Sequence, residues 1–437
     1  MSNKLSPLDK FKRKASDTLD RPCSALALNC FQLGCFIPNV PRGGFHGGTN
    51  SDWMQHLCKV NPDVKLRSLC IPGTHDSATD TISPYKPYSA MGRTQNVSIG
   101  EQLLRGIRYL DIRIAGFSNG VGIFHGCLMG APLGVVLSQI TDFLQNHVGE
   151  FLFIEIVQEF GRDFTPAQKK SALDMIQESL GPFQYKDDDR NKLLNDCTLQ
   201  ELTQANTRIC LMVHPRIYFE LDGINYDREM IGNTYHAFDS GKSMYNKWHN
   251  TRDTNLLLQW NLEETQRRAE DSTKILTNQF VLTPGISGAA DIPRLLLGLV
   301  SLRPASFAMT LIPPMEEFFR QHANEPWNIV VMDFIDLVPG LLSFLISLNF
   351  GAELEIVKAT VNNEQGVDVT EMVSKFVYRT RVLFLSDVRK DLDISEREGT
   401  LHIEYKLDGD ETHIMEWEFD DDTEVVLSEY SHMMGKE

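Results

Sequence analysis

Six polar residues stand where short apolar runs of this chain end, and together they could catalyse acid–base chemistry at a phosphate. In chain order they are His75, Asp76, Asp111, Arg113, His125 and Asp333. Strands bury apolar side chains along their length, so charged residues gathered at strand ends indicate a polar pocket there.

The residue types fit transfer of a phosphoryl group to a neighbouring hydroxyl. One imidazole would take the proton of the attacking oxygen, and the other would give a proton to the leaving oxygen. The guanidinium of Arg113 could hold the non-bridging phosphate oxygens, and a carboxylate behind each histidine would fix its tautomer. Each residue also has a structural alternative: Asp111 and Arg113 share one strand face and could simply pair, and Asp333 could cap a strand end.

The elements that must position these residues alternate between strand and helix. Apolar runs predict strands at 66–72, 107–114, 121–124, 151–160, 208–213, 275–282 and 328–335. A capping box of Ser98 with Glu101 predicts one helix, periodic apolar residues predict another over 133–144, and Thr165-Pro166 opens a third. This alternation is typical of an α/β protein, either a (β/α)8 barrel or a doubly wound sheet.

The chain of 437 residues divides into three parts by composition. Residues 1–50 read as a partly disordered leader and 51–350 as the α/β domain. Residues 352–437 read as an acidic β-rich accessory module, with a hairpin at 401–419 that turns at Asp408-Gly409. Such a module is most often an interaction or stabilising appendage, and a protein partner is one expectation for it.

Charge and cysteine usage exclude several classes of protein. The net charge is −17, which argues against nucleic-acid binding and against a polybasic membrane anchor. From Gly351 onward there are 9 Lys/Arg against 22 Asp/Glu, so most of the charge lies in the tail. None of the eight cysteines forms a CxxC pair, which favours reduced thiols. We see no signal peptide or transmembrane run, so we expect a cytoplasmic protein or one peripheral at a membrane.

Six segments in order resemble the X-domain of phosphatidylinositol-specific phospholipases C, of the bacterial, metal-independent type. The resemblance covers roughly residues 51–345. It is carried by Ser51-Asp52-Trp53-Met54, Ile71-Pro72-Gly73-Thr74-His75-Asp76-Ser77, Thr94-Gln95, Gly106-Ile107-Arg108-Tyr109-Leu110-Asp111-Ile112-Arg113, His125-Gly126 and Val331-Met332-Asp333-Phe334-Ile335.

The resemblance implies a distorted (β/α)8 barrel and a division of roles. His75 would be the general base on the inositol 2-hydroxyl, oriented by Asp333. His125 would be the general acid for the diacylglycerol oxygen, coupled to Asp76. Arg113 would hold the phosphate in place of a metal, because the calcium-dependent relatives have Asn after the first histidine and a carboxylate where this chain has Arg113. We therefore expect no cofactor and no metal.

The chain departs from the family where the headgroup is bound. Val157 stands in place of a lysine, and His214 in place of an arginine. Glu155 lies two positions before Val157, hence on the same strand face, and could substitute. Tyr245 and Trp248 lie where the family offers an aromatic ring to inositol.

Three hypotheses follow from these residues. The first is cleavage of phosphatidylinositol or a similar phospholipid by intramolecular transfer, giving a cyclic inositol phosphate and diacylglycerol. The second is a catalytically weak module that binds a headgroup and recruits a partner through its tail. The third is a metal-dependent glycerophosphodiesterase, which would need more carboxylates near His75 than Asp76 supplies.

Overall fold

A computed structural model of the chain describes most of the sequence from Asn50 onward. The residues described are 50–85, 89–118, 120–185, 196–218, 230–231, 237–239, 244–268, 275–284, 304–362, 366–378, 382–392, 399–419 and 426–434. The expected leader at 1–50 therefore lies outside them, apart from Asn50.

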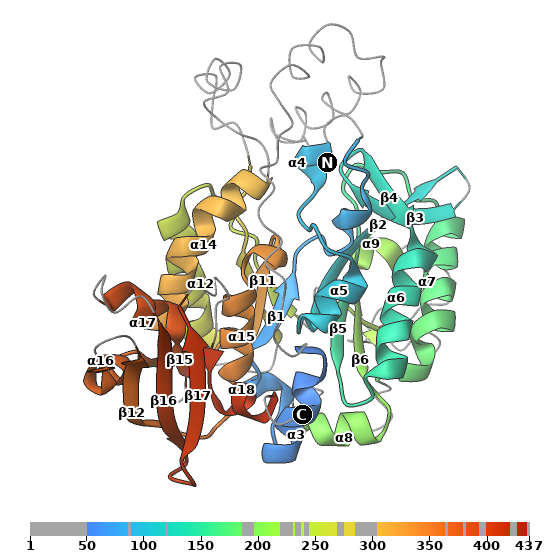
Figure 1. The fold of residues 1–437 in the computed structure, drawn as a ribbon. Coiled ribbons are helices and arrows are strands. Elements are labelled where there is room, and N and C mark those ends of the chain that lie inside the picture. Colours follow the sequence, from blue (N-terminus) through green and yellow to red (C-terminus); the bar gives the residue numbers. More distant parts are fainter. Residues whose placement is uncertain are drawn as a thin grey trace, which may run out of the picture.

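One large sheet forms the centre of the protein (Figure 1). Its strands are β1 (Ile71–Thr74), β2 (Tyr109–Phe117), β3 (Gly120–His125), β4 (Leu128–Pro132), β5 (Leu152–Gln158), β6 (Ile209–Val213), β7 (Met230–Ile231), β8 (Ala237–Asp239), β9 (Met244–Asn246), β10 (Ile275–Phe280) and β11 (Ile329–Met332). Their order is β7-β8-β6-β5-β2-β1-β11-β10-β9, with β3 and β4 continuing antiparallel from β2. Every neighbouring pair from β8 to β9 is parallel, so the carboxyl ends of these strands meet at one edge.

Helices connect the parallel strands, as the alternating pattern predicted. They are α3 (Trp53–Val60), α4 (Ser89–Gly92), α5 (Ile99–Leu104), α6 (Leu133–Asn146), α7 (Pro166–Leu180), α8 (Leu199–Gln204), α9 (Pro215–Tyr218), α12 (Thr254–Arg268), α14 (Pro304–Gln321) and α15 (Pro339–Ser347). The capping boxes predicted at Ser98 and Thr165 are both present. Short 3-10 turns complete this part at Asn50–Asp52, Leu66–Ser68, Thr79–Thr81, Gly181–Phe183 and Ile335–Leu337.

The α/β class is confirmed, but a closed barrel is not shown. Within the described ranges, no strand pairing joins β9 to the opposite end of the sheet at β7 and β8. The predicted strand at 66–72 is also shorter than expected, because Leu66–Ser68 forms a 3-10 turn and β1 begins only at Ile71.

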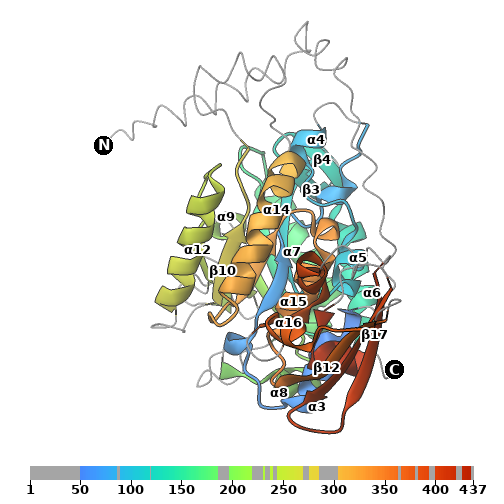
Figure 2. The same ribbon diagram turned by 60° about the vertical axis from the view of Figure 1, so that its left-hand side comes forward.

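The two faces of the sheet bury two different apolar clusters. Alternate residues of β2, among them Leu110 and Ile112, pack with α6 and α7. Tyr109, on the other face, packs with Phe153 of β5 and with Trp53 of α3. Figure 2 shows α12 and α14 beside β10, and their buried residues belong to the same apolar cluster as those of α6 and α7. The strands are therefore buried on both faces, which explains their continuous apolar sequences.

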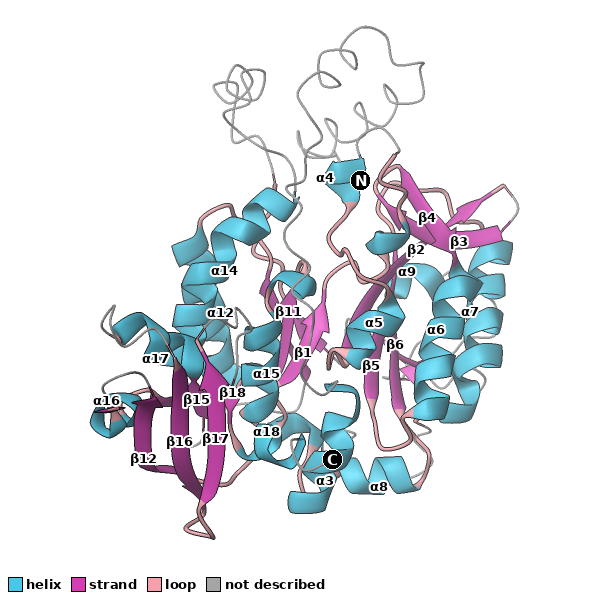
Figure 3. Cartoon of the chain, viewed as in Figure 1, coloured by secondary structure: helices cyan, strands magenta, loops and turns pink. Residues whose placement is uncertain are grey.

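The last part of the chain forms two small antiparallel sheets (Figure 3). The first has the order β13-β12-β16-β17 and the second β14-β15-β18. Their strands are β12 (Leu354–Asn362), β13 (Val367–Asp368), β14 (Val377–Tyr378), β15 (Val382–Phe384), β16 (Thr400–Leu407), β17 (His413–Glu418) and β18 (Val426–Leu427), with helices α16 (Thr370–Ser374), α17 (Leu385–Asp391) and α18 (Glu429–Met434). The predicted hairpin is β16–β17, and Asp408 and Gly409 at its turn both have positive φ.

Helix α18 joins these sheets to the larger part of the chain. It packs against α15 and α3. The Glu429 carboxylate accepts hydrogen bonds from the backbone N–H groups of Gly351 and Ala352, at 3.1 and 2.9 Å, and the hydroxyls of Ser347 and Ser428 lie 3.0 Å apart. The division into a catalytic barrel and an independent accessory domain stays a prediction. No described helix is both long and apolar enough to cross a bilayer.

Candidate active site

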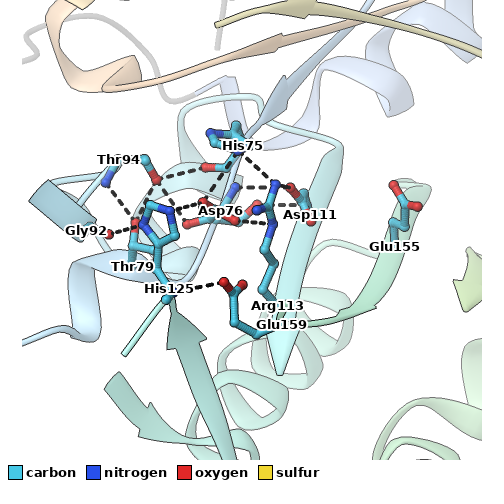
Figure 4. A network of polar contacts seen from close by, with 12 residues as sticks. His75, Asp76, Thr79, Gly92, Thr94, Asp111, Arg113, His125, Glu155 and Glu159 are labelled. Carbon is cyan, nitrogen blue, oxygen red and sulfur yellow. Dashed lines mark hydrogen bonds and ion pairs between the residues drawn. The ribbon is translucent and has the colours of Figure 1, made fainter. Parts of the chain in front are cut away.

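The six residues singled out in the sequence converge at the carboxyl edge of the central sheet. Figure 4 labels His75, Asp76, Asp111, Arg113 and His125 among them. His75 and Asp76 follow β1, Asp111 and Arg113 lie on β2, His125 ends β3, and Asp333 follows β11. Because β11, β1 and β2 are adjacent and parallel, the segments after them are neighbours in space. Gly73 permits this approach, since a Cβ atom there would lie 2.9 Å from Tyr109 Cδ1.

His75 is held through both of its ring nitrogens. Nδ1 lies 2.9 Å from Oδ1 of Asp333, and Nε2 lies 2.9 Å from Nη2 of Arg113. A guanidinium can only donate, so Nε2 accepts from Arg113 and the Nδ1–H group donates to Asp333. This tautomer leaves Nε2 as the basic atom that faces the site.

Arg113 links His75 to two carboxylates. Its Nε contacts Oδ1 of Asp76, and its Nη2 lies 3.3 Å from Oδ2 of Asp111. The side chain of Asp76 is fully buried and that of Asp111 nearly so. These carboxylates raise the pKa of Arg113 even though burial disfavours its charge, so the guanidinium stays a cation.

His125 faces the same carboxylate from the other side. Its Nδ1–H group donates to the backbone oxygen of Gly92 at 2.7 Å, and its Nε2 lies 3.4 Å from Oδ2 of Asp76. Gly126, next in the chain, has φ of 58° and donates its N–H to Glu159 Oε1 at 2.8 Å. Glycine suits this turn, because residues with a side chain rarely adopt that conformation.

The pKa values in this cluster follow from burial and from the charges. Burial disfavours the His75 cation, but the carboxylates of Asp76 and Asp333 outweigh it and raise the pKa of His75 to about 9. The contact between Nη2 of Arg113 and Nε2 of His75 requires the neutral imidazole, because a guanidinium can only donate. Burial raises the pKa of Asp333. Burial also acts to raise the pKa of Asp76, but the guanidinium of Arg113 and the two histidines hold it below its usual range.

Glu155 lies on β5, at the position paired with Asp111 of β2. Its carboxylate accepts from the Tyr109 hydroxyl at 2.6 Å and from Asn246 Nδ2 at 3.4 Å. Gln279 Nε2 in turn donates to Asn246 Oδ1 at 3.0 Å. The sequence pointed to Glu155 but not to Asn246 or Gln279, which come from β9 and β10 and meet Glu155 only in the folded chain.

The other residues predicted to bind the headgroup lie on or beside β9, α9 and β5. Tyr245 alternates with Asn246 on β9 and is 39% exposed, and Trp248, just after β9, is 57% exposed. His214 Nδ1 accepts from the backbone N–H of Arg216 at 3.2 Å, at the start of α9. Val157 is paired with Arg113 across β5 and β2. Their roles in binding stay predictions.

Two further polar residues at the site were missed as functional groups. Gln95 contacts the segments after both β1 and β11, and Glu159 lies against the backbone of Gly126. Gln95 stood inside one of the resemblance segments, but its contacts are to backbone atoms distant in sequence, and no spacing rule shows those.

His75, Asp76 and Asp111 also have the geometry of a small cation site. One ligand atom from each lies within 4.8 Å of the others. An imidazole with two carboxylates is a plausible donor set for a divalent ion. Arg113 contacts both of these carboxylates, so its guanidinium already neutralises the oxygens that such an ion would need.

Comparison with known proteins finds a matching family model and several similar proteins. Residues 63–227 match the PI-PLC X model. PI-PLC X domain-containing protein 2 of Mus musculus is 25% identical over 332 residues, 69% of this chain and 88% of the relative. PI-PLC X domain-containing protein 3 of Mus musculus is 26% identical over 335 residues, 69% of this chain and 94% of the relative. The resemblance that the motifs indicated is thus confirmed: residues 63–227 match the PI-PLC X model, and the chain is similar to PI-PLC X domain-containing proteins.

Bacterial proteins share the fold and part of the sequence. A 1-phosphatidylinositol phosphodiesterase of Listeria monocytogenes is 36% identical over 117 residues, 25% of this chain and 34% of the relative. The solved structure of a phosphatidylinositol-specific phospholipase C from Listeria monocytogenes superposes with a TM-score of 0.51 at 21% identity, covering 69% of this chain and all of that one. At that identity the superposition supports the fold alone.

Proposed function

We propose that this protein cleaves phosphatidylinositol, or a phospholipid with a similar polyol headgroup, by transferring the phosphoryl group to a neighbouring hydroxyl. The observation that carries the proposal is the convergence of two imidazoles and one guanidinium on Asp76. An acid, a base and a fixed cation within reach of one phosphate are the groups that such a transfer needs.

The proposed step moves one proton onto His75 and one away from His125. The headgroup hydroxyl gives its proton to Nε2 of His75 as its oxygen forms a bond to phosphorus. The bond between phosphorus and the lipid oxygen breaks, and that oxygen takes a proton from Nε2 of His125. The products are a cyclic phosphate on the headgroup and diacylglycerol. Arg113 stabilises the charge that grows on the non-bridging oxygens.

The carboxylates prepare the two histidines for these opposite tasks. Asp333 binds the Nδ1–H group of His75 and stabilises the imidazolium that forms when Nε2 takes the proton. Oδ2 of Asp76 stands 3.4 Å from Nε2 of His125, the atom from which the proposed proton is donated. Because Arg113 neutralises Asp76 and Asp111, we propose that the reaction requires no metal ion.

The substrate class is supported by the relatives and by the polar side chains around Glu155. The Listeria relative is a 1-phosphatidylinositol phosphodiesterase. In this chain, Glu155, Asn246 and Gln279 offer acceptors and donors that suit headgroup hydroxyls. A phospholipid substrate also implies that the protein works at a membrane surface, to which it would bind peripherally.

A second candidate is a headgroup-binding module with weak catalysis, and Val157 favours it. The side chain paired with Arg113 across β2 and β5 is apolar, so it offers the headgroup no hydrogen bond. This candidate predicts sedimentation of the protein with phosphatidylinositol vesicles but no turnover. Residues 352–437 would then recruit a protein partner.

The test is turnover of phosphatidylinositol in mixed vesicles by the full chain, with the His125→Ala variant alongside. The proposal expects release of diacylglycerol by the wild type and a loss of about 10²–10⁴-fold in the variant. Vesicle binding by both proteins, with no diacylglycerol from either, would establish the binding module instead.

A further inference from the structure

The residues that follow His75 and Asp333 share an unusual backbone conformation. Asp76 has φ of 45° and Phe334 has φ of 51°, both in the left-handed region that residues with side chains seldom adopt. Such conformations persist only where surrounding contacts fix them. The two segments that carry the His75–Asp333 pair must therefore be held from outside.

Gln95 holds both segments with one side chain. Its carboxamide is fully buried. Nε2 donates to the backbone oxygens of His75 and Met332, at 3.2 and 3.0 Å, and Oε1 accepts from the N–H of Ile335 at 3.4 Å. The contact with His75 lies just after β1. The contacts with Met332 and Ile335 lie on either side of Asp333, at the end of β11. A primary amide has two N–H donors, and here both are used.

Thr94 adds a second connection between the same segments. Its backbone oxygen accepts from the N–H of Phe334 at 2.8 Å. Its hydroxyl lies 3.1 Å from the backbone oxygen of His75 and 2.8 Å from the Thr79 hydroxyl. In Figure 4, Thr94 lies directly beside His75 and Asp76. Thr94 and Gln95 thus bind the ends of both β1 and β11.

We propose that Gln95 is a positioning residue that sets the hydrogen bond between His75 Nδ1 and Asp333 Oδ1. By fixing the backbone on both sides of this pair, Gln95 keeps the Asp333 carboxylate opposite Nδ1 and so leaves Nε2 facing the site. Gln95 would play this positioning role in the protein without substrate, and only the expected effect on turnover rests on the proposed function.

A buried glutamine nearby provides a matched control. Gln102 is also fully buried, and it also makes three hydrogen bonds: Nε2 donates to the backbone oxygens of Ser77 and Val97, at 2.7 and 2.8 Å, and Oε1 accepts from the Thr74 hydroxyl at 2.8 Å. All three partners belong to β1 or to the chain between β1 and α5, and none belongs to the segment that carries Asp333. A purely structural loss at Gln102 should lower stability without separating His75 from Asp333.

The experiment compares Gln95→Met with Gln102→Met by NMR titration of ¹⁵N-labelled histidine, together with thermal melting. The charged groups that face His75 are Asp76, Asp333 and Arg113. If Gln95 holds Asp333 in place, its loss removes part of the stabilisation of the imidazolium, and the His75 titration moves from about 9 toward the ordinary 6.5. Gln102→Met should melt at a lower temperature and leave the titration unchanged.

Turnover gives a second readout. We expect kcat to fall by about 10²-fold in Gln95→Met with little change in KM, because misplacement of a catalytic group by about 1 Å has effects of that size. If Gln95→Met does not fold, Gln95→Asn keeps a neutral amide that is one methylene too short to reach both segments, and it should give the same shift.

The possible outcomes separate the two proposals. A shifted titration in a protein that shows no wild-type turnover would overturn the proposed function and leave the positioning role intact. Wild-type turnover with an unshifted titration in the Gln95 variants would overturn the positioning role. Equal shifts in the Gln95 and Gln102 variants would do the same, since the effect would then be general loosening.

Discussion

The Nε2 atoms of His75 and His125 each lie 3.4 Å from the same oxygen, Oδ2 of Asp76. The other oxygen of that carboxylate contacts Arg113. One buried aspartate thus binds all three groups proposed to act on the phosphate. Its backbone conformation, with φ of 45°, sets the direction of the carboxylate.

Removing either imidazole should abolish most of the activity. We expect His75→Ala and His125→Ala each to lower kcat by about 10²–10⁴-fold, because each supplies one proton transfer. His147→Ala is the matched control: His147 also pairs with an aspartate, Asp52, at 2.9 Å, but it caps the carboxyl end of α6. Initial rates on phosphatidylinositol vesicles test this, and rates near wild type in either catalytic variant would refute the assigned roles.

Replacing Arg113 by lysine should be costly even though the charge is kept. A guanidinium can hold two phosphate oxygens at once while staying in contact with Asp76 and Asp111, and an ammonium cannot. We expect Arg113→Lys to lower kcat/KM by about 10²-fold. Wild-type activity should persist in excess chelator, because we propose that Arg113 takes the place of a metal. Loss of wild-type activity in chelator, restored by a divalent ion, would argue for the metal-dependent alternative.

The rate should rise with pH over the range in which His75 loses its proton. A general base must be neutral, and the pKa of His75 in the free protein is raised to about 9, so kcat/KM should increase up to that pH. Asp333→Asn removes one of the carboxylates that raise this pKa, so the rising limb should move toward 6.5. An unchanged limb in Asp333→Asn would show that another group titrates.

The raised pKa of His75 should also make the stability of the protein depend on pH. The folded-state pKa of His75 lies above the ordinary histidine value of 6.5, so its contribution to stability is fully present below about pH 6.5 and is lost as the pH rises through about 9. The difference in melting temperature between wild type and His75→Gln should therefore shrink over that interval. A difference that is constant from pH 6 to 10 would contradict the raised pKa.

A buried ion pair beneath the site should be important for folding. Arg108 and Glu150 have no exposed side-chain surface, and Arg108 Nη2 lies 2.6 Å from Glu150 Oε2. Glu150 also accepts from the backbone N–H of Gln55 at 2.9 Å, at the start of α3. Glu150→Gln leaves Arg108 buried without its counter-charge and should lower the free energy of unfolding by about 3–5 kcal/mol. Denaturant titration measures this, with Lys170→Ala in an exposed pair as the control.

Much of the site could be predicted from the sequence because its residues stand at strand ends. Parallel neighbouring strands bring His75, Arg113 and Asp333 together whatever their separation along the chain. The capping boxes at Ser98 and Thr165 were equally local, and both are present. Closure into a barrel, which the described strands do not show, could not be tested in this way, since it depends on pairing between segments far apart in sequence.

The residues that were missed act through contacts that leave no local pattern. Gln95 reaches Met332 across 237 positions and binds a backbone oxygen, which any residue type could supply. Asn246 and Gln279 meet Glu155 only because β9 and β10 stand opposite β5 in the folded sheet. Strand alternation placed Glu155 on the right face, but it could not show which side chains would meet it there.

The most direct test of the proposed chemistry is the identity of the first phosphorus-containing product. Full-length protein should be incubated with phosphatidylinositol vesicles in chelator and followed by ³¹P NMR. Intramolecular transfer predicts that a five-membered cyclic inositol phosphate appears first, at the rate of diacylglycerol release, and that His75→Ala yields none. An acyclic inositol phosphate as the first product, or no phosphorus product at all, would contradict it.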